Sequence, residues 1–365
     1  MRILAIDVGT GTQDILLFDT TQAIENCVQL ILPSPTEMAA RRIARATLER
    51  RPVVLVGTIQ GGGPCHWALQ RHLQARLPAF ATPEAAQTFD DDLDQVRSMG
   101  VTIVSEDEAR ALDGRAARIE LKDLDIEAIR RALSLFEVEG EWEGLALACL
   151  DHGAAPPGYS DRLFRFEHLR RVVEAGNDLR RFAMVPEEVP EYLTRARAML
   201  RLASREGVPT VFLDTGPAAA LGALQDPQVA RRREQLIINL GNMHTLAFHL
   251  RGTYIYSLFE HHTGLLSGQQ IEELAQRLVH GTLTHEEVFA GHGHGVFYAD
   301  RSGGRRPFLA VTGPQRGKLR GSRLSPYFAV PHGDMMLAGC FGLLWGFAER
   351  YPQHREEVLA ALGLS

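Results

Sequence analysis

An aspartate followed by two glycines near the N-terminus has the composition of a site for a metal-bound phosphate. Asp7 ends an apolar run, and Gly9, Thr10, Gly11 and Thr12 follow before a second apolar run. Glycine lets backbone amides point at an anion with no Cβ in the way. A neighbouring carboxylate can hold Mg²⁺, usually through water. The stretch therefore fits a magnesium–nucleotide site, although a plain hairpin turn would use the same residues.

The same pattern occurs again in the second half of the chain. The stretch QLIINLGNMHTLAFHLRGTYIYSLFE (235–260) contains three apolar runs separated by two turns. Aligned on the first turn, Asn239, Gly241 and His244 correspond to Asp7, Gly9 and Thr12. Two halves with one plan predict a duplicated domain with a cleft between the copies.

The spacing of apolar residues predicts alternating strands and helices. Strands are expected at 2–7, 14–19 and 26–33, then a helix at 36–50 with Thr36 as its N-cap, then a buried strand at 52–58. Three strands, a helix and another strand are the start of a ribonuclease-H-like domain. Charged helices and short strands at about 83–140 are interpreted as an insertion.

The fold class predicted is therefore α/β, with two ribonuclease-H-like domains around a cleft. Domain I is expected at 1–230, with an α/β insertion at about 83–140, and domain II at 231–365.

Composition narrows the classes of partner and the compartment. The net charge of −6 gives no general attraction to nucleic acid or to an anionic membrane. No apolar run reaches the roughly 20 residues that span a bilayer, and no signal peptide is recognisable, so we expect a cytoplasmic protein. The four cysteines form no CxxC pair, which disfavours a disulfide framework or a zinc knuckle.

Several stretches, in this order, resemble landmarks of the actin, sugar kinase and Hsp70 (ASKHA) nucleotide-binding superfamily. They are DVGTGTQ (7–13), DTGPAAALGA (214–223), NLGNMHT (239–245), FLAVTGPQRG (308–317) and GDMMLAGCFGLL (333–344). The resemblance implies an actin-like ATPase fold that binds ATP and Mg²⁺. It implies that Asp7 orients the magnesium ion and that Gly313 lies on the adenosine side. The implied phosphate-binding residues are Gly9, Thr10, Gly11, Thr12, Asn239, Gly241, Asn242 and His244.

More narrowly, the stretches GGGPCHWAL, ATPEAAQTFDDDL, EHHTGLL, HGHGV and PHGDMM resemble an uncharacterised branch of that superfamily. Its members are often labelled pyruvate formate-lyase activating enzymes. An activating enzyme of the radical type holds a [4Fe–4S] cluster on three closely spaced cysteines. The closest pair in this sequence is Cys27 and Cys65, so the residues do not support a radical SAM activase.

One departure from the superfamily pattern concerns catalysis. The second phosphate loop usually carries an acid where this chain has Asn239, and a neutral amide does not neutralise Mg²⁺. Either Asp214 supplies a second carboxylate or hydrolysis is weak. Asp214 could equally cap the helix that follows it. Asp151, Asp214 and His152 are the candidate bases if a hydroxyl attacks.

A triple glycine suggests a second ligand. Gly61, Gly62 and Gly63 follow the strand at 52–58 and precede a helix, so their free amides could meet an anion. We expect a substrate pocket there with His66 or Cys65 at its edge. A turn for close packing of strand and helix is the alternative, and Cys65 is expected to be buried rather than nucleophilic.

Several of the fourteen histidines lie next to glycines or acids. On a strand, His292 and His294 would face the same way and could bind a transition metal together. The possible partners from other loops are Asp151, His152, His261, His262, His332 and Asp334. Substrate contact or acid–base work is the alternative.

Three functions are compatible with these residues. The first is an ATP-dependent phosphotransferase or ATP hydrolase acting on a small molecule, in which positioning and charge neutralisation supply most of the catalysis. The second is a nucleotide-binding switch or sensor with little turnover, which Asn239 favours. The third is a hydrolase with a histidine-bound metal.

Overall fold

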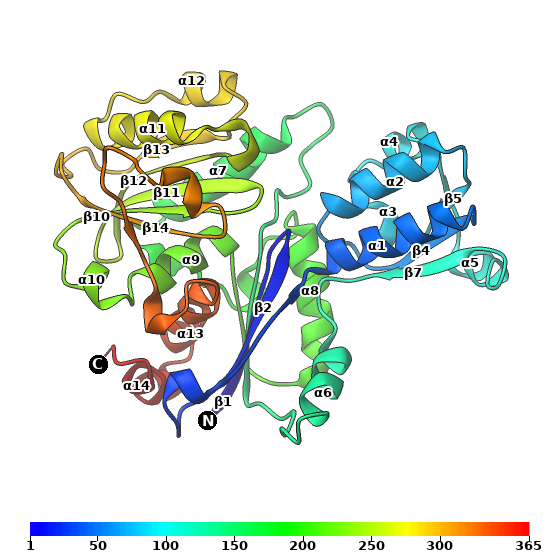
Figure 1. Ribbon diagram of the computed structural model, residues 1–365, viewed down its shortest axis with the longest axis horizontal. Coiled ribbons are helices and arrows are strands. Elements are labelled where there is room, and N and C mark those ends of the chain that lie inside the picture. Colours follow the sequence, from blue (N-terminus) through cyan, green and yellow to red (C-terminus); the bar gives the residue numbers. More distant parts are fainter. Residues whose placement is uncertain (365) are drawn as a thin grey trace.

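The first sheet combines strands from two distant parts of the chain (Figure 1). The computed structural model describes residues 1–364. The strand order is β3-β2-β1-β8-β9, in which β1 to β3 are antiparallel and β8 and β9 run parallel to β1. All six residues of β8 are buried, as expected for an internal parallel strand covered on both faces. The bounds are β1 (Arg2–Val8), β2 (Thr12–Asp19), β3 (Val28–Pro33), β8 (Gly144–Cys149) and β9 (Thr210–Leu213).

The second sheet repeats this plan and adds one edge strand. Its order is β13-β12-β11-β10-β14-β15, in which β10 to β12 are antiparallel and β14 and β15 are parallel to β10. The predicted α/β class with two ribonuclease-H-like halves is confirmed by these two topologies. The bounds are β10 (Gln235–Leu240), β11 (His244–Arg251), β12 (Tyr254–His262), β13 (Gly295–Tyr298), β14 (Phe308–Thr312) and β15 (Tyr327–Phe328).

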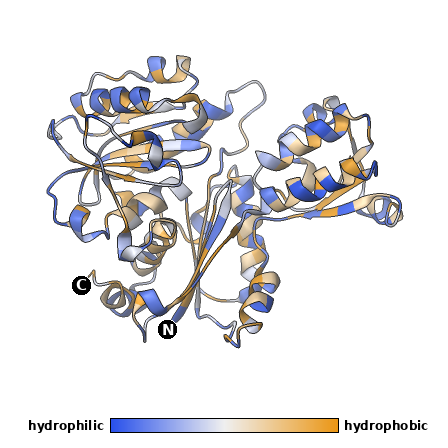
Figure 2. Cartoon of the chain, in the orientation of Figure 1, coloured by the Kyte–Doolittle hydropathy of each residue, from blue (hydrophilic) through white to orange (hydrophobic). Residues whose placement is uncertain are grey.

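A third, fully parallel sheet belongs to an insertion beside the first sheet (Figure 1). Its order is β6-β5-β4-β7, and it has a hydrophobic core of its own. Figure 2 shows hydrophilic and hydrophobic stretches alternating along its helices, which is typical of helices with one face on a core. The bounds are β4 (Val53–Gly57), β5 (Ala79–Ala81), β6 (Val101–Ile103), β7 (Ala117–Leu121), α1 (Pro35–Leu48), α2 (Pro64–Gln74), α3 (Pro83–Ala86), α4 (Leu93–Ser98) and α5 (Glu106–Ala111).

Two expectations for this region are wrong. The strand at 52–58 does not belong to the first sheet, because β4 pairs with β5 and β7, so the insertion begins before residue 83. An apolar strand does not reveal from its own sequence which sheet it joins. Ser34, not Thr36, caps α1 by accepting the Glu37 N–H at 3.3 Å, while the Thr36 hydroxyl donates to the Gly62 carbonyl.

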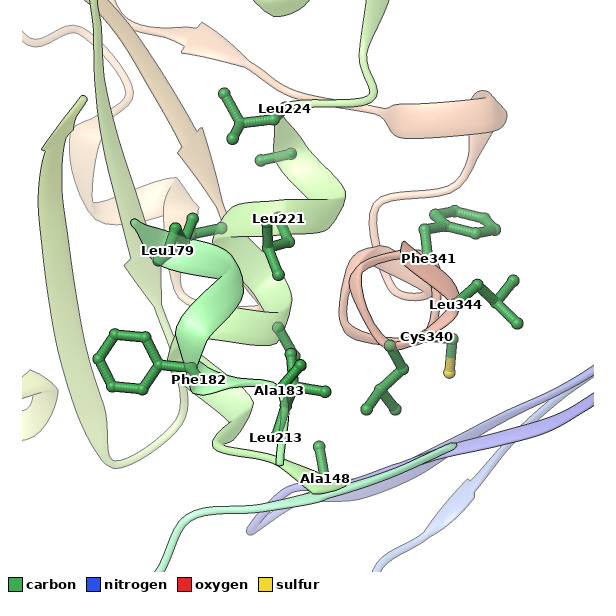
Figure 3. Close-up of a cluster of buried hydrophobic side chains, with 14 of the residues drawn as sticks. Ala148, Leu179, Phe182, Ala183, Leu213, Leu221, Leu224, Cys340, Phe341 and Leu344 are labelled. Carbon is green, nitrogen blue, oxygen red and sulfur yellow. The ribbon is translucent and has the colours of Figure 1, made fainter. Parts of the chain in front are cut away.

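Helices α9 (Thr215–Ala223) and α13 (Ala338–Arg350) pack closely between the two sheets. A Cβ at Gly222 would overlap the Ala338 carbonyl oxygen, and one at Gly342 would overlap that of Ala218, so only glycine permits this approach. Figure 3 shows the buried side chains around the pair, with Leu221 on α9 and Phe341 and Leu344 on α13. Although α13 follows the second sheet in the sequence, it packs against β1, β8 and β9 of the first.

The other helices cover the outer faces of the sheets. None of the helices within residues 1–364 is long and apolar enough to cross a membrane. The α-helices are α6 (Ile126–Ser134), α7 (Asp161–Glu174), α8 (Thr194–Ala203), α10 (Pro227–Ala230), α11 (Gly268–His280), α12 (His285–Ala290) and α14 (Pro352–Ala361). Short 3₁₀ helices lie at Ile24–Asn26, Leu179–Phe182, Pro186–Glu188, Ser204–Glu206, Thr263–Leu265, Arg316–Leu319 and Pro331–Gly333.

Candidate functional site

A cleft of about 230 Å³ lies between the two ribonuclease-H-like halves, and both glycine turns line it. Its walls also include the triple glycine and the first residues of α9 and α13. The predicted site residues that line it are Asp7, Gly9, Thr10, Thr12, Gly61, Gly62, Gly63, His152, Asn239, Gly241, Asn242, His244 and Gly313. Tertiary structure therefore gathers segments that are more than 300 residues apart in the sequence.

The two glycine turns have the same geometry. The Gly9 N–H donates to the Thr12 carbonyl oxygen at 2.9 Å, and the Gly241 N–H donates to the His244 carbonyl oxygen at 2.9 Å. The strand registers agree as well, since Asp7 pairs with Asp14 and Asn239 pairs with Leu246. The alignment predicted from the sequence is thus the structural one.

The turns face one another and present free amides. A Cβ on Gly11 would overlap the Asn242 side-chain nitrogen, so the two loops are in contact. Thr10, Asn242 and Met243 line the cleft, and their N–H groups donate no hydrogen bond to another group within residues 1–364. Unpaired amides on two opposed turns can bind an anion from both sides.

Asp7 lies between the N-termini of the two central helices. Its Oδ1 accepts a hydrogen bond of 2.8 Å from the Thr215 hydroxyl of α9. A Cβ at Gly339 of α13 would overlap its Oδ2, so glycine at that position makes room for the carboxylate. Helix N-termini favour negative charge. Burial, and after it the charge of Asp14, nevertheless raise the pKa of Asp7 to about 8.

Asp14, which the sequence analysis did not select, lies opposite Asp7 on β2. Burial raises the pKa of its carboxyl to about 7. Its Oδ1 is buried and has no hydrogen-bond partner among residues 1–364. Two neighbouring carboxylates that are costly to ionise on their own suit a hard divalent cation, because the cation favours the ionised form of both. The sequence does contain a signal for Asp14. If 2–7 and 14–19 are paired as a hairpin around the glycine turn, Asp14 falls opposite Asp7.

Asp214 is occupied elsewhere. Its Oδ1 caps α9 by accepting the Gly216 N–H at 3.1 Å, and both its oxygens accept hydrogen bonds from Arg165. The fully buried Arg165 also donates to both oxygens of Glu260, at 3.2 and 3.3 Å from Nε. Burial alone would raise the pKa of Glu260, but the positive charge of Arg165 helps to hold this pKa well below its usual range. Asp14 is therefore better placed than Asp214 to be the second carboxylate near a metal.

Asp151 is also used structurally. Its two carboxylate oxygens accept the N–H groups of Gly153 at 2.8 Å and Ala196 at 2.9 Å, and burial raises its pKa. Of the three candidate bases, His152 is the one that lines the cleft. Burial lowers the pKa of His152 well below its usual range, so the ring is neutral at pH 7.

The triple glycine borders the first glycine turn. A Cβ on Gly63 would lie 3.3 Å from the Thr10 methyl carbon, and the Gly61 N–H donates to Asp123 at 3.2 Å. Arg195 pairs with that same carboxylate through Nε at 2.5 Å and lines the cleft. His66 and Cys65, expected at the pocket edge, are not among the lining residues of this cleft. Burial raises the pKa of the Cys65 thiol to about 11, which makes it a poor nucleophile.

Gly313 and Asn239 meet at the end of β10. Gly313 has φ +94°, and a Cβ there would lie 2.6 Å from the Asn239 Oδ1, so glycine is needed on both grounds. Its N–H points at the Met335 sulfur at 3.2 Å. Both residues line the cleft.

The histidines group differently from the sequence expectation. His292 and His294 do not share a strand face, because His292 lies in a turn with φ +65° and is exposed. Instead His294 lies close to His152, His244 and His262. His261 points elsewhere, with its Nδ1 3.2 Å from the His262 carbonyl oxygen, and His332 bonds Gln225 at 2.9 Å. His244 thus belongs both to the second glycine turn and to a histidine cluster.

The chain matches the family described as "Putative pyruvate format-lyase activating enzyme (DUF1786)" over residues 60–318. It belongs to this family. The DUF1786 match includes the triple glycine, the second glycine turn and the histidine cluster. The four cysteines of this member are buried and unpaired, and no three of them form a metal-binding group within residues 1–364.

Solved structures that resemble this DUF1786 protein are distant. A ROK hexokinase from Thermus thermophilus is 11% identical, with TM-score 0.33, over 97% of this chain and 100% of that one. The ethanolamine utilization protein EutJ from Carboxydothermus hydrogenoformans is 11% identical, with TM-score 0.33, over 94% and 89%. A PPX-GPPA enzyme from Aquifex aeolicus is 9% identical, with TM-score 0.30, over 98% and 93%. The two sheet topologies establish the fold. No curated protein matches the sequence.

Proposed function

We propose that this protein binds Mg-ATP and is an ATP-dependent phosphotransferase or ATP hydrolase acting on a small molecule. The observation that carries the proposal is the pair of equivalent glycine turns, which face each other across a cleft with Asp7 and Asp14 beside them. We expect its partners to be a nucleotide and a small substrate, with neither nucleic acid nor membrane involved.

The carboxylate pair fits a magnesium ion. Asp7 and Asp14 are buried, and the Asp14 Oδ1 accepts no hydrogen bond from residues 1–364, so its lone pairs are free for a cation. When bound, Mg²⁺ would neutralise phosphate charge and hold the transferred group in line. Oxygen ligands and retained water are what magnesium prefers.

The remaining work falls to groups of the chain itself. Free amides of both turns would bind phosphate oxygens from opposite sides, and the N-termini of α9 and α13 would favour their negative charge. Gly61, Gly62 and Gly63 lie beside the first turn, where a substrate that receives or loses a phosphoryl group would have to bind. Positioning of this kind supplies most of the rate in phosphoryl transfer.

A switch or sensor with little turnover is the second candidate. The second turn carries Asn239 and Leu246 at the positions where the first carries Asp7 and Asp14. At these two paired positions, only the first half of the cleft therefore has carboxylates. Closure of two lobes around a ligand is a hinge motion that needs no hydrolysis.

Thermal unfolding with Mg-ATP tests the proposal. ATP at about 100 times its Kd should add about 2.7 kcal/mol to the free energy of unfolding. For this length of chain, that corresponds to a rise in Tm of about 3 to 4 °C. EDTA or the variant Asp7→Asn should abolish the rise, whereas Asp107→Asn, an exposed carboxylate on α5, should keep it. No shift with any nucleotide, in folded protein, would refute the proposal.

Turnover separates the two candidates. Multiple-turnover release of phosphate in the presence of candidate small molecules would identify an enzyme. A Tm shift that depends on Asp7 without turnover would identify the switch.

A further inference from the structure

Three histidines from separate segments converge on one point of the cleft wall. His152 follows β8, His244 begins β11, and His294 directly precedes β13. Each has a ring nitrogen within 4.8 Å of a ring nitrogen of the other two. Because metal–imidazole bonds are about 2.0 to 2.1 Å long, small rotations of these side chains bring all three nitrogens onto one ion.

His294 has no other use for its polar atoms. Its side chain is 0% exposed, and neither ring nitrogen has a hydrogen-bond partner among residues 1–364. Buried polar groups are nearly always paired, and an unpaired one is costly. The position of His294 against two other imidazoles, rather than in an apolar pocket, indicates that its partner is an ion.

His244 is oriented as a metal ligand would be. Its Nδ1 lies 3.2 Å from Glu260 Oε1, and Arg165 fixes that carboxylate from the other side. An N–H on Nδ1 that donates to a carboxylate leaves the lone pair on Nε2 free for a metal. Carboxylate partners of this type hold the ligand ring in position and raise its basicity. Glu260 and Arg165 are therefore positioning residues for this site.

We propose that His152, His244 and His294 bind a divalent transition-metal ion of the zinc type, with a coordination position open to the cleft. Imidazole nitrogens suit zinc and cobalt, whereas magnesium prefers oxygen. His152 and His244 line the cleft, so the open position faces the ligand-binding space and would accept an oxygen ligand from there. Three protein ligands with one open position are typical of a catalytic rather than a structural zinc site.

This site is distinct from the carboxylate pair and does not depend on the proposed function. Asp7 and Asp14 supply hard oxygen donors from the first sheet, while two of the three histidines come from the second. Metal binding uses the lone pair of His152, so His152 is a ligand and no longer a free base. Because His244 also ends the second phosphate turn, the ion would lie next to a phosphate bound there.

Cobalt provides a direct test that needs no assay of activity. Tag-free protein is stripped with EDTA and titrated with Co²⁺, and the visible absorption of four- or five-coordinate cobalt is recorded. One Co²⁺ per chain should bind, Zn²⁺ should displace it, and excess Mg²⁺ should not. His294→Ala and His152→Ala should each weaken binding at least about 100-fold, more than the loss of a supporting contact does.

Matched controls remove histidines outside the cluster. His292→Asn changes an exposed residue two positions from His294 in the same turn and tolerates its positive φ, and His280→Ala changes an exposed residue on α11. Both should bind Co²⁺ like the wild type, and so should Asp7→Asn. If His294→Ala is unfolded, His294→Gln, which keeps most of the volume, serves in its place. Absent cobalt absorption in the wild type, or unchanged affinity in the folded cluster variants, would overturn the proposal.

Discussion

Arg165 offers the sharpest test of how the two halves are held together. It extends from α7, which follows the first sheet's β8, and ion-pairs with Asp214 at the end of β9 and Glu260 on β12. The side chains of Arg165 and Glu260 are both completely buried, with 0% of their surface exposed to solvent. The variant Arg165→Met keeps similar bulk and leaves two buried carboxylates without their cation.

The expected loss is large because the charges stay behind. Removing one partner of a buried ion pair costs about 3 to 5 kcal/mol, against 0 to 1 kcal/mol for an exposed pair. Asp214 keeps the Gly216 N–H and Glu260 keeps His244, so we expect about 3 to 5 kcal/mol rather than twice that. With an unfolding entropy of about 2.1 cal/mol/K per residue, Tm should fall by about 4 to 7 °C.

Urea unfolding, followed by far-UV circular dichroism and tryptophan fluorescence, measures this loss. Arg45→Met is the control, since Arg45 is 82% exposed and its pair with Glu49 at (i, i+4) should cost at most about 0.5 kcal/mol. Arg165→Lys should fall between the two, because an ammonium group is a point charge that cannot reproduce the bidentate contacts.

The pH dependence provides a second criterion. In the variant, the unpaired carboxylates have raised pKa values when folded, so the folded state binds protons that the unfolded state does not. The difference in stability between wild type and Arg165→Met should therefore grow as pH rises from 5 to 8. A loss below about 1 kcal/mol that is also independent of pH would refute the view that Arg165 holds two charged carboxylates.

Two further predictions follow from single side chains. Gly339→Ala should displace the Asp7 carboxylate and abolish the rise in Tm with Mg-ATP. Gly317→Ala is the control, because its Cβ would meet nothing within 4 Å, and it should leave the rise unchanged. An intact rise in Gly339→Ala would contradict the placement of Asp7. Burial lowers the pKa of His168 to about 4, so the unfolded state binds the proton first and stability falls as pH drops from about 6.5 towards 4. Urea unfolding at pH 7 and pH 5 measures this effect. Between these pH values, the free energy of unfolding of His168→Gln should fall by about 2 kcal/mol less than that of the wild type. An equal fall in both proteins would show that His168 does not titrate in this way.

The sequence by itself determined the features that depend on neighbouring residues. The two glycine turns, their mutual alignment and the strands on either side follow from local alternation of apolar and small residues, and the structure gives them equivalent hydrogen bonds. The small-residue stretch at 214–223, which the resemblance singled out, forms α9, where Gly222 permits the close approach of α13.

Tertiary structure alone decided which side chains meet. Asp14 reads in the sequence as one polar residue of a strand, and only pairing with β1 places it beside Asp7. The sequence left Asp214 open between a second carboxylate near the metal and a helix cap, and only the fold places Arg165, 49 residues away, on its oxygens. The strand at 52–58 belongs to the inserted sheet because it pairs with β5 and β7. Both partners come later in the chain, so the strand's own sequence does not reveal the pairing.

The histidine cluster illustrates the same limit. His292 and His294 are neighbours in sequence, but a left-handed turn separates them, and His294 instead meets His152 and His244 from other segments. Local spacing sets the direction of a side chain only within one regular element. Between elements, the packing of the two sheets and the inserted domain decides, and no short stretch of sequence contains that information.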